Sequence, residues 1–186
     1  MTGKTTFIPG LTILEPKVME DSRGYFFESY NKEKMNASGV YSEFVQDNQS
    51  KSQYGVIRGL HYQKNPYAQS KLVRVLEGTI FDVALDIRSG SPTFGKWFGL
   101  ELSADNKLQL FIPAGFAHGF SVISESAIVL YKCDVFYNPG SEAGINCKDP
   151  KLQIDWRIKQ GKEIISSKDS NQPLFENADY NFIFKG

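Results

Sequence analysis

The chain has 186 residues, of which 41% are hydrophobic, 13% aromatic and 23% charged, as in an average folded domain. Its 21 Lys and Arg balance its 21 Asp and Glu, so the net charge is zero with neutral histidine. This balance argues against a nucleic-acid-binding protein, whose affinity depends on excess positive charge. The apolar runs are shorter than the ~20 residues that a membrane-spanning helix needs. We therefore expect a single domain over residues 1–186 that binds neither nucleic acid nor membrane.

The N-terminal segment, the cysteines and the histidines limit the compartment and the chemistry. The opening MTGKTTFIPG lacks the apolar stretch of a secretory signal. Cys133 and Cys147 match neither a disulfide framework nor metal-ligand spacing, so a reducing cytoplasm is expected. The sequence contains two histidines, His61 and His118, and nothing in it indicates that they are neighbours. We therefore expect chemistry without a metal or other cofactor.

Alternating hydrophobicity predicts a protein built mainly of short strands. Residues 79–88 (TIFDVALDIR) place four apolar side chains on one face and Asp82 and Asp86 on the other. A short helix is expected near 31–38, ending at Gly39, and a second one near the C-terminus. The other predicted strands, separated by turn residues, span 25–30, 56–62, 71–76, 96–102, 108–112, 119–123 and 127–137. Such a pattern is typical of a sandwich, jelly roll or small barrel, whose interior can hold a ligand.

The segment RGLHYQ (58–63) contains the first candidate site residues. Arg58 and His61 have an odd spacing, so in a regular strand they would point to opposite faces. Gly59 lies between them, and both can serve one pocket if the strand bulges there. The simpler interpretation of His61 is a half-buried histidine paired with a neighbouring group.

A second group of candidates lies on two other predicted strands. Tyr131 and Tyr137 share parity, which predicts that both phenols face the same side. They are either core aromatics whose hydroxyls reach the rim, or proton donors. Lys71 begins its strand and is either a solvated rim residue or an inward-pointing cation that stabilises an oxyanion.

The remaining candidates have simpler interpretations on the sequence alone. Asp82 and Asp86 lie opposite an apolar face, so we expect them to be exposed. His118 lies in PAGFAHGF (113–120) and is interpreted as a turn histidine bonded to the backbone. Cys133 is expected to be a small buried hydrophobe.

Several longer motifs follow one another in register: DSRGYFFESY (21–30), FVQDNQSKS (44–52), VIRGLHYQ (56–63), SKLVRVLEGTIFDVALDIRSGSPTFGKW (70–97) and FIPAGFAHGFSV (111–122). Together with LYKCDVFYNPGSE (130–142) and SSKDS (166–170), they resemble the dTDP-4-dehydrorhamnose 3,5-epimerase family over nearly the whole chain. The resemblance implies an all-β, cupin-type jelly roll with one or two short helices. It also implies a homodimer in which strands cross between subunits.

The resemblance further implies an isomerase whose substrate is dTDP-4-dehydro-6-deoxy-D-glucose. The C4 ketone acidifies the protons on C3 and C5, and inversion of both centres gives dTDP-4-dehydro-L-rhamnose, a precursor of dTDP-L-rhamnose. His61 is then the general base and Asp169 the carboxylate that orients it. Lys71 stabilises the oxyanion, Tyr131 returns the proton, and Asp82 is an auxiliary residue.

The residues that the resemblance implies for substrate binding come from most parts of the chain. Tyr137 matches the ring that stacks on thymine. The full set is Arg23, Phe26, Glu28, Gln46, Asn48, Arg58, Lys71, His118, Tyr137, Glu142 and Lys168. A few of these cations would form a basic pocket on an otherwise balanced surface, which suits a pyrophosphate.

Three alternatives stay open at this point. A relative that inverts only C3 would use the same base and acid. A 3,4-ketoisomerase uses a similar barrel and substrate but moves the carbonyl. A non-catalytic cupin that binds a nucleotide sugar is disfavoured by the set His61, Asp169, Tyr131 and Lys71, because binding alone needs no acid–base pair.

Overall fold

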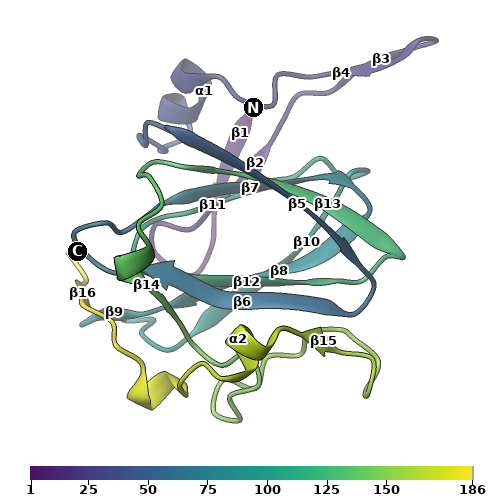
Figure 1. Ribbon diagram of the computed structural model, residues 1–186. Helices are drawn as coiled ribbons and strands as arrows, with labels where there is room; N and C mark the ends of the chain where they lie inside the picture. The colour runs from purple at the N-terminus through teal and green to yellow at the C-terminus, as the bar shows by residue number, and fades with distance from the viewer. Residues whose placement is uncertain (186) are drawn as a thin grey trace.

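The computed structural model describes residues 1–185 and shows two β-sheets packed face to face (Figure 1). The first sheet has the spatial order β1 (Thr2–Thr5), β2 (Thr12–Glu15), β11 (Gln109–Ile112), β7 (Lys71–Glu77), β13 (Ser126–Cys133) and β5 (Gln46–Gln53). The second has the order β10 (Trp97–Ser103), β8 (Thr79–Asp86), β12 (Phe116–Val122), β6 (Val56–Gln63) and β14 (Glu142–Gly144). The neighbours in both sheets are antiparallel, which confirms the predicted all-β jelly roll.

The smaller elements lie around these sheets. β15 (Ile164–Ile165) runs parallel to β6, and the two-stranded pairs are β3 (Met19–Asp21) with β4 (Gly24–Phe26), and β9 (Arg88–Ser89) with β16 (Phe182–Ile183). The helices are α1 (Lys32–Ala37), α2 (Ser167–Ser170) and the 3-10 turns η1 (Pro139–Ser141) and η2 (Phe175–Asn177). Both predicted short helices are therefore confirmed. Asn31 caps α1 and Ser166 caps α2, each accepting a backbone N–H from within its helix.

Two predicted strands extend several residues too far, and seven strands of the described residues lie outside every predicted range: β1, β2, β3, β5, β14, β15 and β16. The strand predicted at 25–30 ends at Phe26, and the one predicted at 127–137 ends at Cys133. Tyr137 therefore lies outside the strand that holds Tyr131, and the predicted parity between the two does not apply. Among the missed strands, β5 has the sequence QDNQSKSQ, whose polar residues give no hydrophobic alternation.

Apolar side chains form two main layers, one on each face of the second sheet. Between the sheets lie Val73, Val75, Ile80, Ala84, Leu110, Ile112, Phe116, Phe120, Val122 and Val129, among others. On the outer face lie Ile57, Leu60, Tyr62, Phe81, Val83, Leu85, Ala117, Ile145, Leu152 and Trp156, among others. The chain after β14 supplies this outer cover and passes beneath β6 (Figure 1).

This outer cover explains why the expectation of exposed aspartates on β8 is wrong. Asp82 and Asp86 are both 0% exposed. The apolar face of β8, with Phe81 and Val83, packs against the outer layer rather than between the sheets. The opposite face of the strand therefore points between the sheets, where Ile80 and Ala84 join the inner core.

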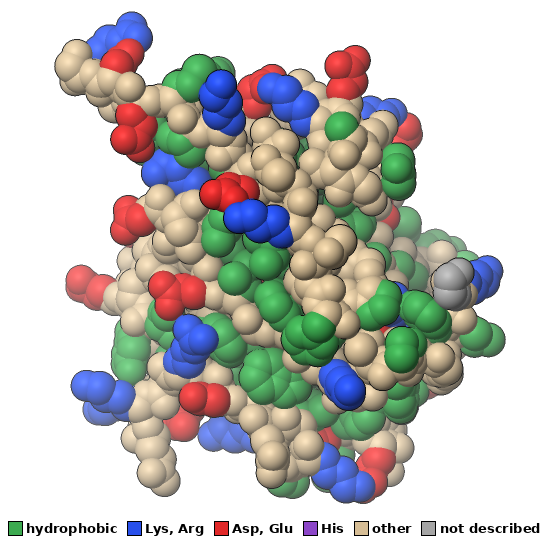
Figure 2. Space-filling model, turned by 180° about the vertical axis from the view of Figure 1, so that it is seen from behind, with side chains coloured by type: hydrophobic (Ala, Val, Ile, Leu, Met, Phe, Trp, Pro, Cys, Tyr) green, Lys and Arg blue, Asp and Glu red, His purple; other side chains and the backbone are tan. Residues whose placement is uncertain are grey.

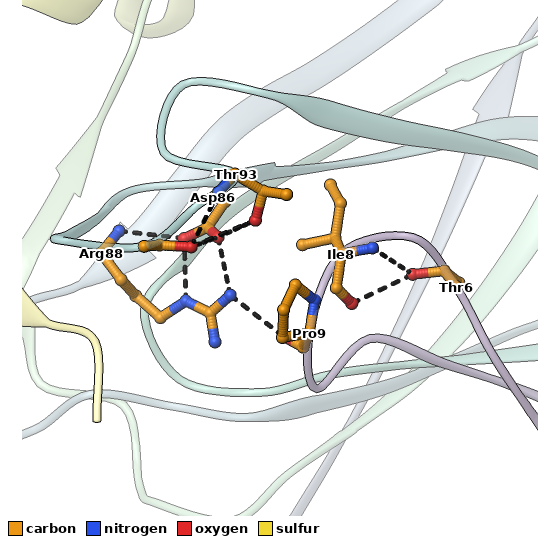
Figure 3. Close-up of polar contacts among 7 residues, drawn as sticks. Thr6, Ile8, Pro9, Asp86, Arg88 and Thr93 are labelled. Carbon is orange, nitrogen blue, oxygen red and sulfur yellow. Dashed lines mark hydrogen bonds and ion pairs between the residues drawn. The ribbon is translucent and has the colours of Figure 1, made fainter. Parts of the chain in front are cut away.

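Asp86 is the centre of a buried polar cluster (Figure 3). Its carboxylate accepts hydrogen bonds from Arg88 Nε at 2.8 Å, Arg88 Nη2 at 2.7 Å, Ser91 Oγ at 2.6 Å and Thr93 Oγ1 at 2.7 Å. Arg88 Nη2 also donates to the carbonyl of Pro9 at 3.0 Å, which ties the N-terminal loop to the second sheet. Burial alone would raise the pKa of Asp86, but these hydrogen bonds hold it below its usual value.

The face of the molecule seen from behind is not dominated by one sign of charge (Figure 2). Seen from behind, apolar side chains gather in the middle of the molecule, and acidic and basic side chains are interspersed around them (Figure 2). No helix within residues 1–185 has the length and apolar character needed to cross a bilayer.

The Asp86 cluster generates a stability prediction. Asp86→Ala leaves the Arg88 guanidinium, whose side chain is 11% exposed, without its charge partner, and should lower the free energy of unfolding by about 3–5 kcal/mol. The lowered pKa means that the carboxylate contributes stability above its unfolded-state pKa near 3.9 and loses that contribution as the pH falls through its folded-state pKa. The difference between wild type and variant in urea unfolding should therefore shrink below about pH 4.

Lys4→Ala is the matched control, because it breaks an ion pair whose partners, Lys4 and Glu15, are largely exposed. Its cost should stay below about 1 kcal/mol. A comparable loss in both variants, or no change with pH for Asp86→Ala, would contradict the assignment.

Candidate active site

A cavity of about 220 Å³ opens between the two sheets. The first sheet contributes Gln46, Asn48, Lys71, Tyr131 and Cys133, and the second contributes His61, Tyr62, Gln63 and Glu142. Gln69 and Tyr137 complete the lining from loops. Seven of the fifteen residues that the sequence predicted for the site therefore line one cavity.

Lys71 and Tyr131 lie on neighbouring strands of the first sheet, where β7 pairs with β13. The Lys71 ammonium is 5.8 Å from the centre of the Tyr131 ring. Burial lowers the pKa of Lys71, and the nearby acidic groups, Asp82 among them, oppose this shift. Burial raises the pKa of Tyr131, so the phenol is protonated at neutral pH. Of the two interpretations of Lys71, the inward-pointing one is correct.

The strand β6 carries the bulge that the sequence suggested near Gly59. His61 pairs with His118 on β12, and Arg58 pairs with Phe120, so β6 uses one more residue than β12 over this stretch. The extra residue changes the parity of β6 and puts Arg58 and His61 on the same face. Gly59 has φ +116°, a backbone conformation that residues other than glycine rarely adopt.

His61 is paired with a buried carboxylate from a distant part of the chain. Its Nε2 lies 2.7 Å from Oδ1 of Asp169, which stands on α2. The other oxygen, Oδ2, accepts the backbone N–H of Gly59 at 3.3 Å. Burial alone would raise the pKa of Asp169, but its hydrogen bonds, that from His61 foremost, hold it below its usual value. The carboxylate stays ionised and fixes the imidazole tautomer with Nε2 protonated, which leaves Nδ1 to accept a proton.

A second imidazole–carboxylate pair lies beside the first. His118 Nε2 is 2.8 Å from Oδ1 of Asp82, and the His118 side chain is 7% exposed. Burial lowers the pKa of His118, although Asp82 opposes the shift. Asp82 Oδ2 is buried and has no hydrogen-bond partner among residues 1–185.

Two expectations about the histidines are therefore wrong. His118 is on a strand and bonds a side chain, whereas the sequence suggested a turn residue bonded to backbone. His118 and His61 are direct cross-strand neighbours, although the sequence gave no indication of it. Strand pairing brings together residues that are distant along the chain.

Tyr137 and Glu142 line the cavity, and Lys168 pairs with Glu142. Glu142 accepts a hydrogen bond from the Tyr137 hydroxyl at 2.8 Å and forms an ion pair with Lys168 at 2.7 Å. The bond to Glu142 raises the pKa of Tyr137, and the same carboxylate raises the pKa of Lys168. Gln46 Oε1 accepts the Tyr137 backbone N–H at 3.0 Å, which anchors this loop to the first sheet.

Four lining residues were missed as site candidates: Tyr62, Gln63, Gln69 and Cys133. Gln63 is two residues from His61 on the same strand, so the two side chains point to the same face. This spacing could have indicated Gln63 from the sequence. Its side chain donates to the Tyr67 carbonyl and accepts the Asn138 N–H, so it holds the loop that carries Tyr137. Gln69 gave no signal in the sequence. Cys133 is buried as expected, but it also lines the cavity, and Asn48 approaches its sulfur at 3.7 Å.

Eight predicted residues are not part of the cavity lining. Asp169 and Lys168 pair with the lining residues His61 and Glu142, and Asp82 pairs with His118, the cross-strand neighbour of His61. The other four are Arg23, Phe26, Glu28 and Arg58. Arg23 and Phe26 are exposed on and beside the β3–β4 hairpin, which projects from the rest of the chain (Figure 1). Glu28 follows this hairpin and pairs with Lys34. Arg58 lines a neighbouring groove, where its Nε donates to Ser52 Oγ at 3.0 Å.

The cavity therefore offers acid–base chemistry from two sides. The second sheet presents an imidazole held by a carboxylate, and the first presents a protonated phenol beside an ammonium group. Within residues 1–185, no group of three or more His, Cys, Asp and Glu side chains is arranged to hold a metal ion. The fold and cavity define a cupin-type jelly roll with an acid–base pocket between its sheets.

Comparisons with known proteins identify the family within this class. The model of the dTDP-4-dehydrorhamnose 3,5-epimerase family matches residues 5–177. An enzyme of that name from Shigella flexneri is 53% identical over 176 residues, covering 94% of this chain and 96% of the relative. The chain belongs to the dTDP-4-dehydrorhamnose 3,5-epimerase family and is an isomerase.

Solved structures agree with this assignment. The dTDP-4-dehydrorhamnose 3,5-epimerase from Elizabethkingia anophelis NUHP1 matches with a TM-score of 0.91 at 53% identity, covering 95% of this chain and 97% of that one. The dTDP-6-deoxy-D-glucose-3,5-epimerase from Legionella pneumophila, solved in complex with dTDP-4-keto-L-rhamnose, matches with a TM-score of 0.91 at 49% identity. This second match covers 96% of this chain and 94% of that one.

Proposed function

We propose that the protein inverts C3 and C5 of dTDP-4-dehydro-6-deoxy-D-glucose, and that the cavity between the sheets is where it does so. The observation that carries this proposal is the His61–Asp169 pair, which faces a protonated Tyr131 across one cavity. Inversion at carbon needs a base on one side of the sugar ring and an acid on the other. The residues that would perform each step follow from this arrangement.

His61 is the proposed general base. Asp169 occupies its Nε2, so Nδ1 takes the proton from C3 or C5. The electrons of the broken C–H bond move to the oxygen of the C4 ketone and form an enolate. The His61 imidazole is neutral before the step and carries a charge of +1 after it, and the fixed carboxylate of Asp169 stabilises that cation.

Lys71 is the proposed partner of the enolate oxygen. A cation held in a site with little water stabilises a developing oxyanion more than the same cation does in bulk water. Asp82 and His118 lie near Lys71, and the Asp82 charge acts to keep the amine protonated. This is the auxiliary role that we propose for Asp82.

Tyr131 is the proposed acid. Its O–H gives a proton to the same carbon from the opposite face, which inverts the centre. The raised pKa keeps the phenol protonated until the carbanion forms. Afterwards His61 holds one extra proton and Tyr131 lacks one, and exchange with water restores both groups.

The mouth of the cavity is the proposed site for the nucleotide. Tyr137 is 51% exposed and offers a ring face to thymine, while Gln46, Asn48, Glu142 and Lys168 offer polar contacts nearby. Arg58 faces the same side as His61 and suits the pyrophosphate.

We further propose a homodimer in which the β3–β4 hairpin reaches the cavity of the partner subunit. Arg23 and Phe26 are exposed, with the Arg23 side chain 88% accessible and paired with Asp21 alone among the described residues. Such an exposed ion pair contributes little and is easily exchanged for a phosphate. Met19, Tyr25 and Phe26 add apolar surface that a second subunit would cover. A cytoplasmic location is proposed on the two free, buried thiols.

The function is tested by incubating the purified protein with dTDP-4-dehydro-6-deoxy-D-glucose in D2O and reducing the product with a coupled 4-ketoreductase. We expect deuterium at C3 and C5 and an L-configured sugar by NMR. His61→Asn should lower turnover by about 100- to 10,000-fold while dTDP affinity in calorimetry stays the same, because the nucleotide contacts lie elsewhere. Deuterium at C3 alone would favour a monoepimerase, and a carbonyl at C3 would favour a ketoisomerase.

Tyr131→Phe tests the second half of the reaction. The base is intact, so hydrogen exchange at C3 in D2O should continue, with retained configuration, while inverted product falls by at least about 100-fold. Tyr54→Phe is the matched control, because the Tyr54 hydroxyl accepts the Lys159 backbone N–H away from the cavity. Equal losses of exchange and inversion in Tyr131→Phe would make Tyr131 a positioning residue.

The hairpin proposal is tested by mixing two inactive subunits. Arg23→Ala and His61→Asn chains, co-expressed with different tags, should regain activity, because one site of each heterodimer combines an intact hairpin with an intact base. Random pairing predicts about a quarter of the wild-type activity. No recovery would mean that Arg23 serves its own chain or that the subunits do not pair.

A further inference from the structure

The backbones of β6 and β12 approach each other closely at two glycines, Gly59 and Gly119. A Cβ atom on Gly119 would lie 2.6 Å from the Arg58 carbonyl oxygen and 3.3 Å from the Gly59 Cα. A Cβ atom on Gly59 would lie 2.6 Å from the Gly119 Cα and 2.6 Å from the His118 carbonyl oxygen. A Cβ atom on Gly119 would also lie 3.2 Å from Leu60 Cδ2, but the nearest atom to each Cβ belongs to the backbone of the other strand. Neither strand therefore accepts a side chain here without moving the other.

This glycine contact coincides with the bulge of β6. The register shift lies between His118 and Phe120, so Gly119 is the β12 residue that faces the extra residue. Gly119 itself has no positive φ, and its lack of a side chain is explained by the close packing alone.

At the same residues, the edge of β6 that faces away from β12 has no strand partner among the described residues. β15 pairs with Val56 and Ile57, and β14 pairs with residues 61–63. Between them, the outer edge of β6 is free of strand pairing, and the Leu60 N–H goes to the Ile145 carbonyl at 3.1 Å. The Gly59 N–H points to this unpaired edge and reaches Asp169 Oδ2 at 3.3 Å.

We infer that Gly119 is a positioning residue for the epimerisation: its packing against Gly59 holds the β6 bulge that aims His61 into the cavity and presents the Gly59 N–H to Asp169. Gly119 touches no reacting atom and acts through β6. The inference rests on the proposed function, since it assigns a purpose to the geometry of the proposed base.

Gly119→Ala tests it. The methyl group should push β6 away at Arg58 and loosen the contact of Asp169 with both His61 and Gly59. We expect kcat to fall by about 10- to 100-fold with little change in KM, because small displacements of a catalytic group reduce turnover by such factors. The imidazole N–H proton of His61, shifted downfield by its bond to Asp169, should move upfield or broaden in the NMR spectrum of the substrate-free protein.

Gly99→Ala is the matched control. Gly99 lies on β10 of the same sheet, away from β6, and a Cβ there would meet the Phe81 ring at 2.2 Å. It should lower the stability while leaving kcat and the His61 proton signal unchanged. A matching loss of kcat in both variants would reduce Gly119 to a general packing role and overturn the inference.

A double-mutant cycle separates action through the carboxylate from general damage. If Gly119 acts through Asp169, then Gly119→Ala should cost much less in an Asp169→Asn background than in wild type. Additive losses of kcat would overturn the inference. The NMR signal does not need turnover, so it tests the inference even if the wild-type protein fails to epimerise the proposed sugar, a result that would overturn the proposed function.

If Gly119→Ala does not fold, replacement of Gly59 by glycolic acid tests the other part of the inference, which is the hydrogen bond from the Gly59 N–H to Asp169. It does so without adding a side chain. The resulting ester lacks the N–H that Asp169 accepts but keeps the freedom of glycine. The expected result is a lower kcat and a shifted His61 proton in a folded protein. An unchanged kcat and proton signal would show that this N–H does not position the pair.

Discussion

The central strands of the second sheet lie between two apolar layers, so each polar side chain on them must find a partner inside the protein. Asp82 pairs with His118, and Asp86 pairs with Arg88. His61, on β6 of the same sheet, pairs with Asp169 from the segment that covers the outer face. The burial that stabilises the sheet therefore also creates pairs of charged or ionisable groups. Such groups can perform acid–base chemistry.

The two-sheet architecture distributes these groups over opposite walls. Lys71 and Tyr131 belong to the first sheet, while His61 and His118 belong to the second. A flat sugar ring between the walls would therefore meet a proposed base on one face and a proposed acid on the other. Burial supports each role, because it keeps the Tyr131 phenol protonated and makes the Lys71 charge depend on its acidic neighbours.

Local features of the sequence predicted much of the fold. The alternation in 71–76 and 79–88, Gly39 and the turn residues gave the helix at 31–38 and every strand of seven or eight residues except β5, because these signals depend on neighbouring residues. Strand β5 was missed because its residues are polar, and the end of the strand at Cys133 gave no local signal. Gly59 gave a correct prediction of a bulge, since a glycine between Arg58 and His61 has a specific conformational meaning.

The site, like the fold, was predicted from the sequence only in part. The chain by itself determined which side chains are available, and its family motifs predicted which of them belong to one site. Only the tertiary structure decided that Asp82 is buried, that His118 neighbours His61, and that the hairpin with Arg23 stands apart from the cavity. These outcomes depend on which face of a strand is covered and which strands pair, and contacts between distant residues set both.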